Sequence, residues 1–152
     1  MCLIKEFYEN IDFVIHLGAI TDTTETDVDK LKRFNTNFSI SIWDFCTQYH
    51  IPLIYASSAA TYGSSDVFDD RTHPNFLKPI NEYAVSKNDF DKFVMFMANT
   101  IDPYGQNHQP PFWAGLKFFN VYGINEFHKG RSEEHTSELQ SPCNLVCRLL
   151  LE

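Results

Sequence analysis

The chain has 152 residues and a formal net charge of −8, with 43% hydrophobic, 15% aromatic and 21% charged residues. This composition is typical of a folded globular domain, and the acidic balance argues against a nucleic-acid partner held through phosphate contacts. No apolar run approaches the ~18 residues of a membrane span, the start lacks a signal-peptide pattern, and four scattered cysteines do not form a disulfide framework, so we expect a cytoplasmic domain without a membrane partner.

Three short apolar segments, at residues 12–18, 52–58 and 115–121, have the near-continuous hydrophobicity of strands buried in a sheet. Two amphipathic helices are predicted between them, over residues 27–49 and 82–100, because apolar residues recur there at spacings of three and four. The apolar stripes are Val28, Leu31, Phe34, Phe38, Ile42 and Phe45 in the first helix, and Val85, Phe90, Phe93, Val94 and Met97 in the second. Strand and helix alternate, which predicts an α/β fold with a parallel sheet covered by helices.

Polar residues follow each predicted strand, at residues 18–25, 57–63 and 120–130. The carboxyl ends of parallel strands meet at one edge of a sheet, and ligands bind outside that edge. We therefore expect the three loops to form one binding region. His16, inside the first apolar segment, is expected to be a hydrogen-bonded core or loop histidine, since no cluster of metal-ligating residues surrounds it in the sequence.

The sharpest local signal is Tyr83 followed by Lys87 at the start of the second predicted helix. A spacing of four places both side chains on one helical face, where a lysine ammonium favours the phenolate of a nearby tyrosine and suits it to acid/base work. Ser58, at the end of the second predicted strand, offers a hydroxyl that can bond a substrate oxygen. Each has a plainer alternative: Lys87 exposed on an amphipathic helix beside a packed Tyr83, and Ser58 as a helix N-cap.

Serine, tyrosine and lysine in this order, on a predicted α/β fold, resemble the catalytic set of the short-chain dehydrogenases/reductases. Three longer segments are similar to an extended branch of that superfamily, the ADP-glycero-manno-heptose 6-epimerases of lipopolysaccharide inner-core synthesis. They read His-Leu-Gly-Ala-Ile-Thr-Asp-Thr-Thr-Glu at 16–25, Tyr-Ala-Ser-Ser-Ala-Ala-Thr-Tyr-Gly at 55–63, and Phe-Phe-Asn-Val-Tyr-Gly with Glu-Phe-His-Lys-Gly within 118–130. The resemblance implies a Rossmann-like, doubly wound parallel sheet.

The resemblance also implies roles for individual residues. Ser58 would position the substrate, Tyr83 would act as acid/base, Lys87 would bind the nicotinamide ribose, and Lys129 would be a second acid/base that also contacts the substrate. Asn35 would support the active site from the neighbouring helix. The remaining implied contacts are Asn120 to the substrate, and Leu17, Gly18, Ala19, Ile20, Thr21 and Val121 to the cofactor.

The implied reaction is inversion of C6 of an ADP-sugar through a transient 6-keto intermediate, with NADP as cofactor and NAD as the alternative. Inversion needs an acid/base group on each face of the sugar, which gives Lys129 a role beside Tyr83. Nucleotide-sugar dehydratases place an Asp-Glu pair where this chain has Ala59 and Ala60, so dehydration is disfavoured. The resemblance suggests a homo-oligomer for the full-length parent.

The chain departs from the family pattern at both ends. None of its six glycines forms the Gly-x-Gly-x-x-Gly turn that binds a pyrophosphate, so residues 1–130 are expected to supply strands 4 to 6 of the family sheet, with an apolar edge at the first strand. Residues 131–152 resemble a translated sequencing adapter and are expected to be a non-native tail, a natural variable C-terminus being the alternative. We expect this piece, without the first strands and the C-terminal substrate domain, to be inactive by itself.

Two other functions remain open from the sequence. One is a different extended short-chain dehydrogenase, such as a UDP-sugar 4-epimerase. The other is a non-catalytic nucleotide-binding scaffold that keeps the fold, in which Tyr83 would have no chemical role.

Overall fold

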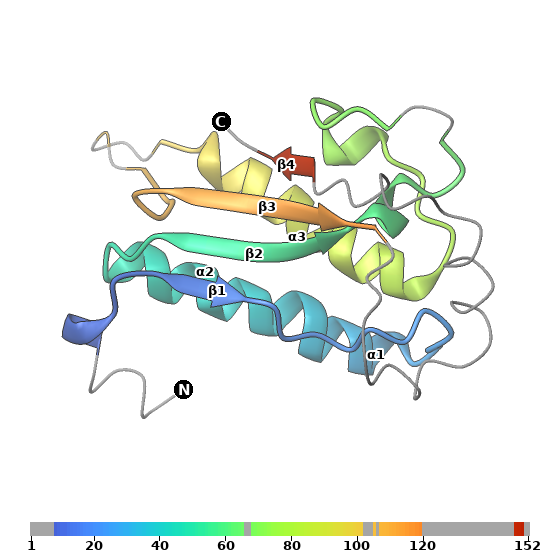
Figure 1. Ribbon diagram of the computed structural model, residues 1–152, viewed down its shortest axis with the longest axis horizontal. Coiled ribbons are helices and arrows are strands. Elements are labelled where there is room, and N and C mark those ends of the chain that lie inside the picture. Colours follow the sequence, from blue (N-terminus) through green and yellow to red (C-terminus); the bar gives the residue numbers. More distant parts are fainter. Residues whose placement is uncertain (1–7, 66–67, 102–104, 106, 120–147, 151–152) are drawn as a thin grey trace.

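A computed structural model describes residues 8–65, 68–101, 105, 107–119 and 148–150 (Figure 1). Strands β1 (Val14–His16), β2 (Leu53–Ser58) and β3 (Trp113–Phe118) pair in parallel, in the order of the sequence. This confirms the predicted parallel α/β sheet. Strand β3 begins and ends earlier than the predicted segment 115–121. A fourth strand, β4 (Arg148–Leu150), pairs antiparallel with β3 and was not predicted.

Two long helical segments connect the parallel strands, as predicted. The first consists of α1 (Val28–Leu31), the π-helix η3 (Lys32–Asn37) and α2 (Phe38–Gln48), and the second is α3 (Glu82–Ala98). Asp27 and Asn81 begin these segments as N-caps, because their side chains accept hydrogen bonds from the backbone N–H groups of Lys30 and Ala84. The short 3₁₀ turns are η2 (Tyr8–Asn10), η4 (Ala59–Tyr62) and η5 (Pro74–Phe76).

The buried face of the first helical segment differs from the prediction. Leu31, Ile42 and Phe45 are buried, but Val28, Phe34 and Phe38 are about half exposed. Polar residues of and next to η3 are buried instead, namely Asn35, Thr36 and Ser39. The π turn accounts for Phe34 and Phe38, because it rotates the residues within and after it relative to a regular helix of 3.6 residues per turn. Val28 precedes the π turn, and its exposure has no such explanation.

Both long helices lie behind the sheet in Figure 1. Right-handed crossovers between strands that follow one another in one direction place every helix on the same face, and only a reversal of strand order would place one on the other face. The core between helices and sheet consists of Ile42, Trp43, Phe45, Cys46, Ile51, Leu53, Tyr55, Phe90, Val94, Ala98 and Trp113. None of the described helices is long and apolar enough to cross a membrane.

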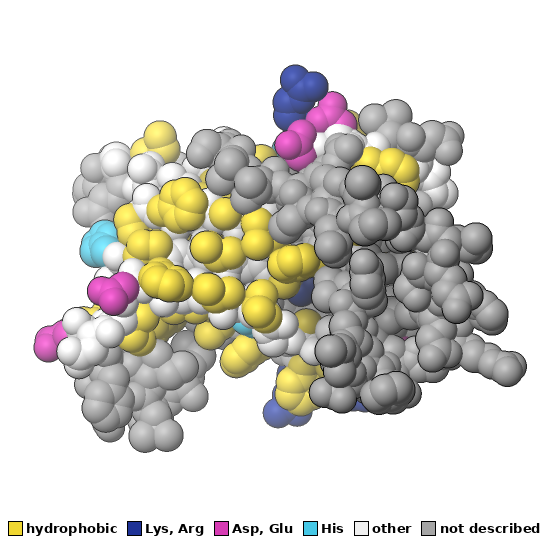
Figure 2. Space-filling model, in the orientation of Figure 1, with side chains coloured by type: hydrophobic (Ala, Val, Ile, Leu, Met, Phe, Trp, Pro, Cys, Tyr) yellow, Lys and Arg dark blue, Asp and Glu magenta, His cyan; other side chains and the backbone are white. Residues whose placement is uncertain are grey.

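Apolar side chains occupy the opposite face of the sheet, where hydrophobic groups gather over β1 to β3 (Figure 2). Phe13, Ile15 and Leu17 belong to this face and are exposed. Strand β1 is at the edge of the sheet, and these residues give it the apolar character that the sequence predicts for its first strand.

Candidate active site

Ser58 ends β2 and begins the 3₁₀ turn η4. Its hydroxyl accepts a hydrogen bond from the backbone N–H of Ala60 at 3.2 Å, so it does act as an N-cap. The same hydroxyl can still donate its own hydrogen to another acceptor, because a serine oxygen can accept and donate at once. The Thr61 hydroxyl donates to the carbonyl of Ser58 at 2.8 Å and thereby fixes the backbone of this turn.

Tyr83 and Lys87 lie in the first two turns of α3, and both are buried. The prediction that places them on one helical face is confirmed by the regular helix, whereas the alternative of an exposed Lys87 is wrong, since the residue is only 5% exposed. Burial lowers the pKa of Lys87 to about 8, with Lys117 lowering it further and Asp91 opposing the change. Within the described residues the Lys87 ammonium makes no hydrogen bond, so its donors are free for a ligand.

The segment Leu17–Thr21 leaves the carboxyl end of β1 and is tied to the helices by Asn35. The Asn35 side chain accepts from the N–H of Ile20 at 2.8 Å and donates to the carbonyl of Ile20 at 3.0 Å. It also donates to the Ser86 hydroxyl at 3.1 Å, and Ser86 in turn donates to the carbonyl of Tyr83. Asn35 therefore links the expected cofactor loop to the turn of α3 that carries Tyr83.

His16 is a satisfied core histidine, as predicted. Its Nε2 is 2.8 Å from the hydroxyl of Ser39, which donates to the carbonyl of Asn35. Burial, and then the charge of Lys87, lower the pKa of His16 to about 4. The imidazole is therefore neutral at neutral pH and adds no positive charge beside Lys87.

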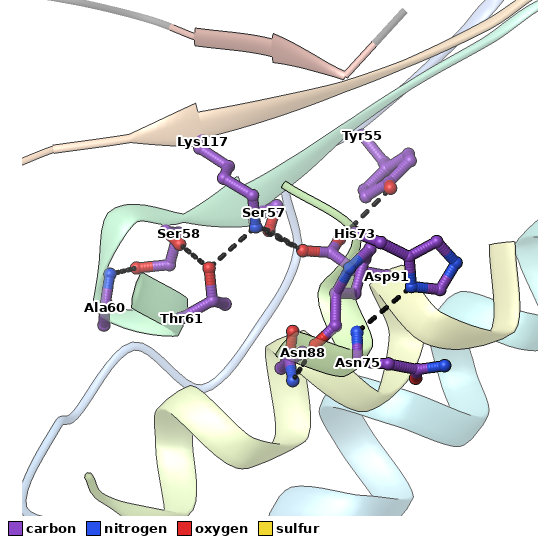
Figure 3. A network of polar contacts seen from close by, with 11 residues as sticks. Tyr55, Ser57, Ser58, Ala60, Thr61, His73, Asn75, Asn88, Asp91 and Lys117 are labelled. Atoms are coloured by element: carbon purple, nitrogen blue, oxygen red, sulfur yellow. Dashed lines mark hydrogen bonds and ion pairs between the residues drawn. The ribbon is translucent and has the colours of Figure 1, made fainter. Parts of the chain in front are cut away.

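A buried polar network joins β2, η4, α3 and β3 (Figure 3). The Lys117 ammonium binds the Asp91 carboxylate at 2.6 Å and the Thr61 hydroxyl at 2.7 Å. The Ser57 hydroxyl donates to Asp91 at 2.6 Å, and the Tyr55 hydroxyl donates to it at 3.1 Å.

Sequence reasoning missed this network, although two signals point to it. Lys117 is a charged residue within an apolar strand, and Asp91 follows Lys87 by one helical turn. A charged residue inside a core segment needs a buried partner, and the two residues supply each other with one.

Three of the expected site residues, Asn120, Val121 and Lys129, lie outside the described residues. In the described part of the chain, no group of three or more His, Cys, Asp or Glu side chains could hold a metal ion. The expected site residues that the structure describes are Ser58 at the end of β2, the loop Leu17–Thr21 after β1, Asn35 in η3, and Tyr83 and Lys87 in α3.

Known proteins of one family are similar to this chain. The model of the NAD dependent epimerase/dehydratase family matches residues 2–141. An ADP-L-glycero-D-manno-heptose-6-epimerase of Fusobacterium nucleatum is 45% identical over 131 residues, which cover 84% of this chain and 37% of that protein.

Solved structures show the same fold. The ADP-L-glycero-D-manno-heptose-6-epimerase of Helicobacter pylori is 26% identical with a TM-score of 0.64, covering 85% of this chain and 38% of that one. A UDP-Glc/GlcNAc 4-epimerase of Campylobacter jejuni is 25% identical with a TM-score of 0.63, covering 87% and 40%. The chain thus spans less than half the length of each of these relatives. Because the family model matches most of the sequence and the fold agrees, the chain belongs to the NAD-dependent epimerase/dehydratase family.

Proposed function

We propose that this chain supplies the acid/base and ribose-binding residues of a nucleotide-sugar epimerase that inverts C6 of ADP-glycero-manno-heptose. The observation that carries the proposal is Lys87, a buried ammonium without a hydrogen-bond partner in the described part of the chain, one helical turn from Tyr83. A buried charge held without a partner costs stability, which is typical of a group kept for a ligand. The 45% identity to the Fusobacterium epimerase supports the choice of substrate.

The residues fit a nicotinamide dinucleotide, which would supply a reversible hydride acceptor when bound. Lys87 would bind its ribose, and the loop Leu17–Thr21, held by Asn35, would lie along it together with Val121. We assign NADP as the cofactor, with NAD as the alternative.

The chain's own residues would move the protons. Tyr83 takes the proton of the C6 hydroxyl as the carbonyl forms, and the Lys87 ammonium favours the tyrosine's phenolate form. Ser58 and Asn120 orient the sugar. Lys129 returns a proton when the other face of the ketone is reduced, which completes the inversion.

A second candidate is a UDP-sugar 4-epimerase, which the Campylobacter structure favours by its similar fold. A hybrid enzyme separates the two candidates. In it, this chain replaces the matching segment of the Fusobacterium epimerase, and turnover is measured on ADP-glycero-manno-heptose and on UDP-glucose.

We expect epimerisation of the ADP-sugar and a ~10²–10⁴-fold loss of rate with Tyr83→Phe. The matched control, Tyr49→Phe at the far end of α2, should keep the rate. Turnover of UDP-glucose alone would favour the second candidate. A rate unchanged by Tyr83→Phe would instead indicate a scaffold without a chemical role for this residue.

A further inference from the structure

Lys87 and Asp91 lie one turn apart on α3, and both are buried, with 5% and 0% of their surfaces exposed. Opposite charges at this spacing are neighbours on a helix and ordinarily pair, most of all where water is excluded. In this chain they do not. Asp91 binds Lys117 of β3 at 2.6 Å, and the Lys87 ammonium makes no hydrogen bond within the described residues.

Several contacts fix the position of the Lys117 ammonium beside Asp91. It is only 1% exposed, and besides Asp91 it donates to the hydroxyl of Thr61 at 2.7 Å and lies 3.4 Å from that of Ser57. Thr61 is bonded to the carbonyl of Ser58, so the same ammonium reaches the turn that carries the candidate serine (Figure 3).

The Asp91 carboxylate also accepts hydrogen bonds from two side chains of β2. Ser57 donates to one oxygen, and Tyr55 donates to the other. Burial and the nearby carboxylate hold the pKa of Tyr55 well above its usual value, so this phenol remains a donor. Gly115 of β3 leaves room for the ring, because a Cβ there would lie 2.5 Å from Tyr55 atoms.

Among the described residues, the charged and titratable groups around Lys87 come from three elements. They are Tyr83 and Asp91 on α3, Lys117 on β3, and His16 on β1, which is neutral at neutral pH. Of these groups, Asp91 carries the negative charge. It would therefore be the ion-pair partner of Lys87 if it were not paired with Lys117.

We propose that Lys117 is a positioning residue that occupies Asp91, and so keeps the Lys87 ammonium unpaired and available to a ligand beside Tyr83. The part of this proposal that concerns a ligand rests on the proposed function of Lys87. The pairing of Lys117 with Asp91 and the unpaired Lys87 ammonium do not rest on it, because the ionisation of Lys87 can be measured in the chain without substrate or cofactor.

The test follows the Lys87 side chain by NMR in the full chain labelled in its lysines. In the unchanged chain we expect a titration midpoint at pH about 8. Lys117→Gln keeps an amide that can donate to Asp91 and Thr61 but removes the charge. Asp91 then attracts Lys87, and the midpoint should rise toward the ordinary lysine value of about 10.4.

Two variants serve as controls. Lys117→Arg keeps the charge and should keep the Lys87 midpoint. Lys92→Met breaks the exposed pair of Lys92 and Asp89, 3.3 Å apart on the same helix, and should also leave Lys87 unchanged. A folded Lys117→Gln chain with an unmoved Lys87 midpoint would overturn the proposal.

The unchanged chain provides a measurement that does not depend on any variant folding. The hydrogens of the Lys117 ammonium should exchange slowly with water, because they are buried and bonded, and those of Lys87 should exchange fast. Slow exchange at Lys87 and fast exchange at Lys117 would show the opposite pairing and contradict the proposal. An inactive hybrid enzyme with these NMR results intact would reject the proposed function alone.

Discussion

His16 is a residue whose ionisation should couple folding to pH. In the folded chain its pKa is about 4, against 6.5 for an unperturbed histidine, because it is buried and faces the positive charge of Lys87. Between pH 6.5 and about 4, His16 is protonated in the unfolded chain and neutral in the folded chain. The free energy of unfolding therefore has its full His16 contribution above pH 6.5, and it falls as the pH decreases from 6.5 to about 4.

We expect His16 to account for a loss of about 3 kcal/mol in unfolding free energy between those two pH values. Urea unfolding at several pH values measures it. His16→Gln should flatten the curve in this range, and His108→Gln, which removes one histidine elsewhere, should not. Equal slopes for the two variants would contradict this account of His16.

At the scale of single residues, the sequence predicts the parts of the site that have a regular spacing. Tyr83 and Lys87 are four residues apart in a helix that forms as predicted, and Ser58 ends a predicted strand. The pairing of Lys117 with Asp91 is not predictable in this way, because the two residues are 26 positions apart and meet only through the packing of α3 on the sheet.

Helix η3 sets the position of the expected cofactor loop. Its Asn35 side chain makes two hydrogen bonds to the backbone of Ile20 and a third to Ser86 of α3. A prediction from apolar residues at spacings of three and four assumes a regular α-helix and cannot detect a π turn. It therefore expects Phe34 and Phe38 to be buried, whereas the structure buries Asn35 and Ser39.

We expect Asn35→Ala to loosen the loop Leu17–Thr21 and leave the sheet intact. Loss of the bond to the N–H of Ile20 should speed hydrogen exchange of that amide about fivefold, since a neutral hydrogen bond contributes about 1 kcal/mol. Exchange mass spectrometry or NMR measures it. The control, Asn37→Ala, changes an exposed asparagine of the same π-helix. An unchanged Ile20 amide in Asn35→Ala would show that the side chain does not hold the loop.

At the scale of the whole molecule, the order of the strands explains which face is covered. The α/β class and the order of elements are predictable from alternating apolar strands and amphipathic helices, and both are confirmed. Strands β1 to β3 advance in one direction across the sheet, so both long helices pack on one face and the apolar side chains of the other face stay exposed. The antiparallel strand β4 was not predicted, because no alternation of apolar strands and amphipathic helices in the sequence points to it.

The central claim, that Tyr83 and Lys87 serve a transient oxidation at C6, is tested most directly with an isotope. The hybrid enzyme is given ADP-glycero-manno-heptose that carries deuterium at C6, in ordinary water, and the product is examined by mass spectrometry and NMR. If the hydrogen leaves and returns as a hydride, the inverted product keeps its deuterium, and Tyr83→Phe slows this reaction without changing the label. Replacement of the deuterium by solvent hydrogen would contradict the account, because it would mean that C6 is inverted by removal of a proton.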